Sequence, residues 1–235
     1  MRVLIACMLV LASTFVFARD LPAPRGVQVA ITVDATGHVS SAKVVDDLPK
    51  ATVARIVERV SAFEFTPASR AGHAAECSTT LWLEFAFEPV DDENVAIRIR
   101  DAYTAPGLVP RKRNNPGYPS EMLRKRLDSD VRLELAYDTE GKVTGTTVLE
   151  STGHPSFGEA AAKMVSRWQL VPERVAGVGV PGTVVVPIAF RIADGRKHAE
   201  PPASRMMETT DAAEPRELVA DSEVALRTAV AGTLL

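Results

Sequence analysis

Residues 27–39 read VQVAITVDATGHV, and residues 131–143 read VRLELAYDTEGKV. The two stretches share alternating apolar positions, an aspartate and a glycine three residues after it. The offset of about 105 residues persists beyond them, which is the signature of an internal repeat. The sequence therefore predicts two copies of one small fold. The further pairs at this offset are Val44 and Val148, Phe63 and Trp168, Pro67 and Pro172, Gly72 and Gly177, and Phe85 and Phe190.

The first copy predicts two strands, a helix and a third strand. Residues 27–33 alternate between apolar and polar, which is the period of a strand with one buried face. Gly37 supplies the positive φ that a tight turn requires, and residues 39–45 form the return strand. Apolar residues recur at helical spacing over 51–60 and predict an amphipathic helix, and residues 81–87 form the third strand.

The second copy follows the same plan, and Ser156 with Glu159 three residues later predicts a capping box at the start of its helix. Each copy therefore has the order β-β-α-β. The predicted fold class is α+β: two tandem modules, each a three-stranded antiparallel sheet with one packed helix. The predicted elements of the second copy are strands over 131–137, 143–149 and 184–192 and a helix over about 156–168.

Composition marks the segments outside the modules. Residues 95–100 alternate and predict an extra strand that forms a hairpin with residues 81–87, and residues 120–127 predict a short helix. A Pro-, Gly- and Asn-rich linker and a charged tail poor in aromatic residues complete the chain. The predicted boundaries are a signal peptide over 1–18, a first module over 19–100, a linker over 101–117, a second module over 118–193 and a mostly disordered tail over 194–235.

The N-terminus has the pattern of a secretory signal. Arg2 precedes an apolar run over 3–18, and small residues at 16 and 18 predict cleavage after Ala18. The run is shorter than the roughly 20 residues that cross a bilayer. We therefore expect a periplasmic protein, with an uncleaved inner-membrane anchor as the alternative.

Composition and motifs favour a binding protein over an enzyme. The net charge of -3 is too small to indicate a nucleic-acid partner, and cleavage would leave one cysteine, Cys77, and no internal disulfide. Ser151 and His154 lie three residues apart without an orienting acid, and the four histidines are scattered. We expect no catalytic residues, no metal and no cofactor.

Residues 114–192 carry several motifs in a fixed order. PGYP at 116–119 precedes the short helix, ESTGHP at 150–155 precedes the helix that ends near Trp168, and VVVPIAF at 184–190 forms the closing strand. This set resembles the C-terminal domain of the TonB family, the periplasmic part of the energy transducer that lets Gram-negative outer-membrane receptors use the proton motive force of the inner membrane. The first copy resembles a degenerate version without the Tyr-Pro motif.

The resemblance implies a mode of binding. In the TonB family this domain takes up a short extended receptor peptide by strand addition, in which main-chain hydrogen bonds supply the affinity. Pro187 lacks an N–H, so we expect pairing in a register that turns position 187 away from the peptide. The candidate partner-binding residues are Tyr118, Pro119, Val184, Val185, Val186, Ile188 and Phe190.

The resemblance implies a periplasmic TonB-like protein that binds an extended peptide of an outer-membrane receptor or other envelope protein, with a link to energy-dependent transport. The full transducer has an N-terminal anchor with a functional histidine and a long Pro-rich spacer, whereas this sequence has no histidine before His38. We therefore expect a soluble adaptor, in contact with the membrane only if the N-terminal segment is uncleaved. The alternative is a structural envelope scaffold or homodimer that pairs through its edge strands.

Overall fold

The computed structural model describes residues 25–90, 95–109, 118–193, 196–200, 224–229 and 233–234. We call residues 25–109 the first half and residues 118–200 the second half. The architecture is α+β and is dominated by antiparallel sheet, as the sequence predicts. The expected signal peptide over 1–18 lies outside the described residues. Within them, no helix combines the length and apolarity that crossing a bilayer requires.

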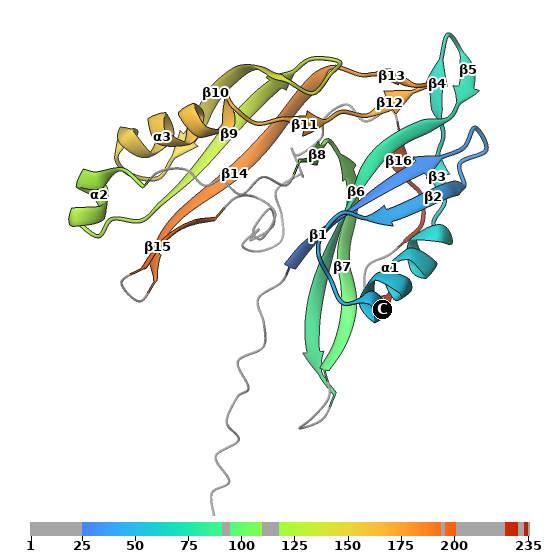
Figure 1. Cartoon of the computed structure of the whole chain (residues 1–235), viewed down its shortest axis with the longest axis horizontal. Helices are drawn as coiled ribbons and strands as arrows, with labels where there is room; N and C mark the ends of the chain where they lie inside the picture. Colours follow the sequence, from blue (N-terminus) through green and yellow to red (C-terminus); the bar gives the residue numbers. More distant parts are fainter. Residues whose placement is uncertain are drawn as a thin grey trace, which may run out of the picture.

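The main elements of the first half are β1 (Arg25–Val33), β2 (Val39–Val44), α1 (Lys50–Ser61), β6 (Cys77–Pro89) and β7 (Val95–Ala105). The strands lie side by side in the order β2-β1-β6-β7, and α1 lies beside them (Figure 1). The hairpin of β6 and β7 confirms the strand predicted over 95–100. Ile56 and Val60 of α1 are buried in the core because the apolar face of the helix points at the sheet.

The main elements of the second half are β9 (Ser129–Tyr137), β10 (Val143–Ser151), α3 (Pro155–Val165), β14 (Gly182–Ala193) and β15 (Arg196–Glu200). Their sheet has the order β10-β9-β14-β15. The three predicted strands and the helix are confirmed, but the sheet has a fourth strand, because β15 turns back along the end of β14. The sequence RKHAE of β15 lacks alternating apolar residues, so its pattern gives no strand signal.

Short elements join the halves. The hairpin of β12 and β13 comes from the second half but pairs with β6 of the first, with Val175 opposite Cys77. Arg70 Nη1 also donates to the carbonyl of Val175 at 3.0 Å. Backbone pairing therefore connects the two halves. The short elements are β3 (Phe65–Thr66), β4 (Ala68–Arg70), β5 (His73–Ala75), β8 (Gly107–Leu108), α2 (Ser120–Arg124), β11 (Leu170–Val171), β12 (Arg174–Val175), β13 (Val178–Gly179), β16 (Ala225–Leu226) and β17 (Thr233–Leu234).

The linker and tail contain more regular structure than the sequence predicts. The expected linker over 101–117 includes the end of β7 and all of β8, and residues 110–117 lie outside the described part. The expected disordered tail over 194–235 includes β15, β16 and β17. These segments become strands by pairing with distant parts of the chain, which a local sequence pattern does not reveal.

The start of α3 differs from the prediction. Pro155 takes the first helical position, and Nδ1 of His154 accepts a hydrogen bond from the Ser156 N–H at 3.3 Å. The predicted N-cap, Ser156, is therefore wrong: the cap is His154, two residues earlier, because the proline after it has a φ suited to the first helical position and no N–H to lose.

Both hairpin turns are held by the same contacts. Each turn glycine has a positive φ, +93° at Gly37 and +80° at Gly141. The carbonyl of Gly37 accepts the Phe65 N–H at 2.8 Å, and that of Gly141 accepts the Leu170 N–H at 2.8 Å. A Cβ on either glycine would lie 2.2 Å from the carbonyl oxygen of Phe65 or Leu170. These positions exclude a side chain because a later segment crosses directly over the turn.

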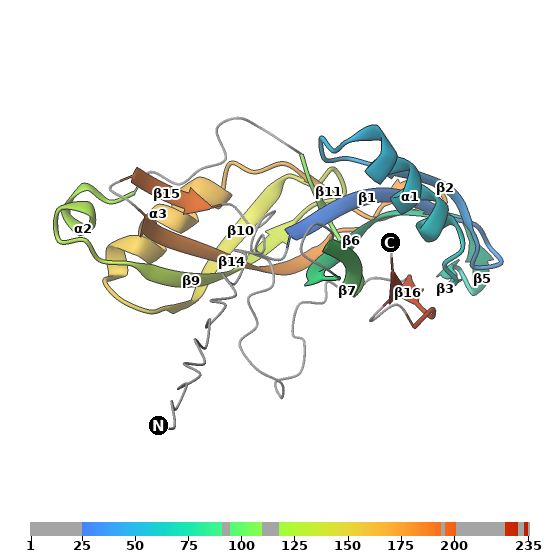
Figure 2. The same ribbon diagram turned by 90° about the horizontal axis from the view of Figure 1, so that it is seen from below.

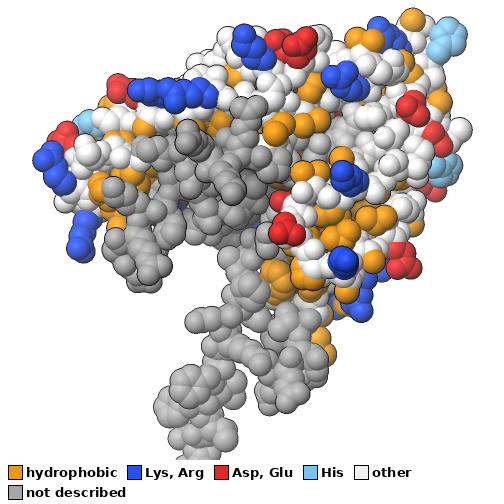
Figure 3. Space-filling model, viewed as in Figure 1, with side chains coloured by type: hydrophobic (Ala, Val, Ile, Leu, Met, Phe, Trp, Pro, Cys, Tyr) orange, Lys and Arg blue, Asp and Glu red, His pale blue; other side chains and the backbone are white. Residues whose placement is uncertain are grey.

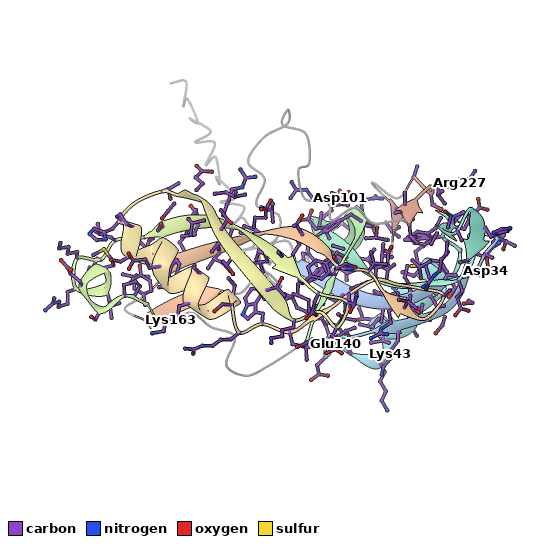
Figure 4. The ribbon with its side chains drawn as sticks, turned by 90° about the horizontal axis from the view of Figure 1, so that it is seen from above. Asp34, Lys43, Asp101, Glu140, Lys163 and Arg227 are labelled. Carbon is purple, nitrogen blue, oxygen red and sulfur yellow. The ribbon has the colours of Figure 1, made fainter. Side chains whose placement is uncertain are left out.

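An aspartate begins each turn. The Asp34 carboxylate accepts the N–H of Thr36 at 2.8 Å and that of His38 at 3.1 Å, and Asp138 accepts the equivalent N–H groups of Glu140 and Lys142. A hydrogen bond from the Thr36 hydroxyl lowers the pKa of Asp34. Asp34 and Glu140, labelled in Figure 4, mark the two turns, which lie at different positions along the molecule.

We expect Gly37→Ala to destabilise the protein more than Gly72→Ala. Gly72 also has a positive φ, +79°, but nothing lies within 4 Å of its added Cβ. Gly72→Ala should therefore cost about 1–2 kcal/mol for backbone conformation alone. Gly37→Ala should cost about 1–3 kcal/mol more, because the carbonyl of Phe65 must move. Urea unfolding of both variants measures the difference, and equal free energies of unfolding would show that the crossing segment does not constrain the turn.

Candidate functional site

The candidate site is the outer side of β14. On one side β14 pairs with β9 from Gly182 to Phe190, and on the other it pairs with β15 only from Ala189 to Ala193. Among the described residues, no strand lies beside residues 183–188 on that second side. We call this stretch of backbone, residues 183–188, the open lane. Figure 2 shows β15 lying along β14 at one end of the second half.

Hydrogen bonds at the end of the sheet show which residues of β14 face the open lane. The backbone of Asp130 faces β10: its N–H donates to Thr152 Oγ1 and its carbonyl accepts the Thr152 N–H, both at 2.9 Å. Because backbone direction alternates along a strand, Val131 faces β14 and pairs with Ile188. The even-numbered residues of β14 therefore face β9, and the odd-numbered residues face the other way.

A contact beyond the end of this pairing agrees with the assignment. The N–H of Ile192 donates to Asp128 Oδ1 at 3.1 Å, on the β9 side of the strand. The open lane therefore presents the N–H groups of Thr183 and Val185 and the carbonyls of Thr183, Val185 and Pro187. Pro187 faces the open lane, in contrast to the register expected from the sequence, in which position 187 turns away from the peptide. It offers an acceptor but no donor.

The side chains predicted to bind a partner lie mainly inside the domain. The even-numbered residues of the strand are buried in the core that α3 covers, whereas Val185 and Pro187 are half-buried on the opposite face. Phe190 is also paired on both sides, with Ser129 of β9 and Ala199 of β15. The strand therefore offers backbone, not apolar side chains, along the open lane. The buried side chains are Val184, Val186, Ile188 and Phe190.

Tyr118 packs under the end of β14. Its ring lies edge-on to Phe157 at 5.6 Å and to Phe190 at 5.7 Å between centroids. Its hydroxyl donates to the carbonyl of Leu127, and burial, together with the nearby Asp128 carboxylate, raises the pKa of Tyr118. Pro119 follows it directly and precedes the first residue of α2. The ring of Tyr118 therefore contacts Phe190 inside the domain.

Comparison with known families assigns this half of the chain. The family model for the C-terminal of the Gram-negative bacterial TonB protein matches residues 114–192. These residues form a TonB C-terminal domain. Protein tonB2 of Pseudomonas aeruginosa is 31% identical to the chain over 77 residues, which make up 33% of this chain and 28% of that relative. The chain therefore spans less than a third of the relative that it matches. The comparison with solved structures gives no match.

Polar contacts close one end of the TonB C-terminal domain. Arg191 Nη2 lies 2.5 Å from Asp130 Oδ1, and Arg191 Nη1 donates at 3.1 Å to the carbonyls of Ser129 and Phe190. These contacts hold the end of β14 to the start of β9. Each exposed ion pair contributes about 0–1 kcal/mol, so their main effect is to fix the register.

Charge on the domain is mixed. Lys125 pairs with Glu121 at 2.8 Å, one turn apart on the exposed side of α2. Blue and red side chains are interspersed over the described part of the face in Figure 3. This surface gives an acidic partner no continuous basic stripe among the described side chains.

The two residues considered for catalysis, Ser151 and His154, are not hydrogen-bonded to each other in the described structure. His154 caps α3 through Nδ1, and the buried hydroxyl of Ser151 has no hydrogen-bond partner in the described structure. In the same part of the chain, no three His, Cys, Asp or Glu side chains are grouped at metal-binding distance. The arrangement around β14 is suited to pairing with backbone.

We expect Tyr118→Ala to destabilise the TonB C-terminal domain by about 2–4 kcal/mol, because the two aromatic contacts are lost. Tyr118→Phe should cost only about 1 kcal/mol, since it keeps the ring and loses the hydrogen bond to Leu127. Denaturant unfolding followed by far-UV circular dichroism measures both. If the alanine variant were as stable as the phenylalanine variant, the ring would not support the core.

Proposed function

We propose that this chain is a TonB-like protein of the cell envelope that binds an extended peptide by adding it as a strand beside β14. Two observations support the proposal: residues 114–192 form a TonB C-terminal domain, and along the open lane the backbone of its closing strand has no partner strand among the described residues. The second observation carries the mechanism, because an unpaired strand edge binds a peptide without requiring a particular side chain.

The open lane sets the length and strength of the proposed contact. β15 already occupies the space beside Ala189–Ala193, so a guest strand has room only opposite residues 183–188. Two donors and three acceptors of β14 are available there. At about 0.5–1.5 kcal/mol for each net hydrogen bond, five bonds give about 2.5–7.5 kcal/mol, which corresponds to weak or moderate affinity. Contacts of the peptide with Val185 and Pro187 would add specificity.

The proposed partner is the extended segment of an outer-membrane receptor or of another envelope protein. The domain would bind it in the periplasm after export directed by residues 1–18. If an inner-membrane complex engages the chain, the proposal includes coupling of peptide binding to energy-dependent transport. Tyr118 and Pro119 would act by holding Phe190, at the end of the open lane, in position.

We also propose that the first half is a degenerate copy of the TonB C-terminal domain. Its strands follow the order β2-β1-β6-β7, as β10-β9-β14-β15 do in the second half, with α1 in the place of α3. The two turn glycines and the segments that cross over them support the same relationship. In the first half β7 runs beside β6 from Thr80 to Pro89, so the equivalent lane is already filled.

A pair of opposite substitutions tests strand addition. Val185→Pro removes an N–H that faces the open lane and should weaken peptide binding about tenfold, because one hydrogen bond and the adjacent pairing are lost. Pro187→Val supplies the missing donor and should strengthen binding about three- to tenfold. Labelled peptides from the N-terminal segments of outer-membrane receptors, titrated against the full chain and followed by fluorescence anisotropy, measure both effects.

Val185→Ala is the matched control, because it keeps the N–H and shortens the same side chain. It should bind within about threefold of the unchanged protein, the effect of losing a half-buried apolar contact of about 0.6 kcal/mol. If alanine and proline at this position weakened binding equally, the side chain would be the binding element and strand addition would be rejected. Sedimentation of Pro187→Val without peptide measures whether two copies of the chain pair through the same backbone groups, and so separates such pairing from peptide binding.

A further inference from the structure

Each half contains a two-residue strand that pairs with a segment from elsewhere in the chain. In the first half, β3 (Phe65–Thr66) pairs with β16 (Ala225–Leu226). In the second half, β11 (Leu170–Val171) pairs with β8 (Gly107–Leu108). β3 and β11 occupy equivalent places in the repeat, since Phe65 and Leu170 are the residues that donate to the two turn glycines.

The two incoming segments bind in the same register. Leu226 lies opposite Phe65, and Leu108 lies opposite Leu170. The next residue also matches: the Arg227 N–H donates to the carbonyl of Glu64 at 2.8 Å, and the Val109 N–H donates to the carbonyl of Gln169 at 3.3 Å. The fold therefore has one type of acceptor site, present twice and filled each time by an extended segment with a leucine at the same position.

The occupant in the second half, β8, follows β7 almost directly in the sequence. Gly107 follows β7 after a single residue, Pro106, so residues 106–109 have no separate freedom to leave. A Cβ on Gly107 would lie 2.5 Å from Thr80 Oγ1, which restricts the position before the leucine to glycine. In the first half the same position is Ala225, which is exposed. A small residue therefore precedes the leucine in both occupants.

The occupant in the first half reaches its site from a distant part of the chain. Val224 is fully buried, and its carbonyl accepts a hydrogen bond from Thr104 Oγ1 at 2.8 Å. The Glu64 N–H donates to Thr228 Oγ1 at 2.8 Å, and β17 adds two residues beside Ile99 and Arg98 of β7.

Most of these contacts involve the main chain of the occupant. Arg59 Nη2 donates to the carbonyl of Leu234 at 2.8 Å, and the Arg227 N–H makes the bond to Glu64 described above. Ala225 and Arg227 are exposed, and Leu226 is half-buried. Figure 4 shows the Arg227 side chain at the outer surface of the first half, away from Lys163 on α3. Val224 and Leu226 pack on the core of the first half, whereas the exposed side chains at 225 and 227 are not fixed by packing, so the site tolerates other residues there.

We propose that the surface formed by β3 and the outer side of β7 is a second peptide-acceptor site, and that residues 224–229 and 233–234 occupy it as an internal ligand. An extended peptide with an apolar residue at the position of Val224 and a leucine at that of Leu226 displaces them. This site is separate from the open lane of β14 and does not depend on it. An occupant in the same chain competes intramolecularly, so a competing peptide binds only as far as this segment dissociates.

The proposal is tested with a labelled synthetic peptide of residues 222–235 and the full chain. Arg227→Pro removes the N–H that bonds to Glu64 and loosens the internal segment, whereas Arg227→Ala keeps that N–H. We expect the peptide to bind Arg227→Pro at least tenfold more tightly than the unchanged protein. Arg227→Ala should bind it within about twofold of the unchanged protein, because its internal segment keeps its main-chain contacts.

A second measurement uses the unchanged protein and does not depend on the folding of a variant. Addition of the peptide in large excess should increase amide hydrogen exchange in residues 224–234 of the protein at least tenfold and leave β7 protected, because one strand replaces another. Equal peptide binding by a folded Arg227→Pro chain and the unchanged protein, or unchanged exchange in residues 224–234 at saturating peptide, would overturn the proposal. Val185→Pro should leave this binding unaltered, which separates the acceptor site from the open lane.

Discussion

An antiparallel strand divides its backbone hydrogen-bonding groups between its two neighbours, residue by residue, and this alternation governs the TonB C-terminal domain. The backbone N–H and C=O groups of the even-numbered residues of β14 face β9. The side chains of the same residues fill the core under α3. The backbone groups of Thr183, Val185 and Pro187 face the opposite side of the strand, the open lane. Folding and the proposed binding therefore involve separate sets of backbone groups, so that the proposed guest strand would not disturb the core.

The sequence was sufficient to predict the long strands, both main helices and the hairpin of β6 and β7, because their periodicity records which face is buried. It could not predict β15 and β16, whose pairing depends on distant strands. Ser156 was misread as the cap of α3 because Pro155 had more influence on the helix start than the capping-box pattern. The direction of Pro187 follows from the register in which β14 pairs with β9, and no local pattern in β14 contains that information.

Several described strand edges are covered by other segments of the chain, whereas β2 and β10 have no strand on their outer sides among the described residues. β7 is paired with β17, β3 with β16, β11 with β8, and the end of β14 with β15. Exposed strand edges promote aggregation, and proteins protect them by covering them or by placing proline there. Pro187 is an example of proline at an edge: it removes one N–H donor from the open lane but leaves room for a guest strand. The proposed peptide site lies where β15 stops covering β14, and the proposed internal ligand is a segment that covers β3 and β7.

Amide hydrogen exchange resolved by residue along β14 tests the central claim most directly. In the peptide-free protein, the N–H groups of Val184 and Val186 should be protected by β9, while those of Thr183 and Val185 exchange rapidly. A bound receptor peptide should slow exchange at Thr183 and Val185 at least tenfold and leave Val184 and Val186 nearly unchanged. Equal protection of all four amides without peptide, or no slowing at Thr183 and Val185 when peptide is bound, would contradict strand addition beside β14.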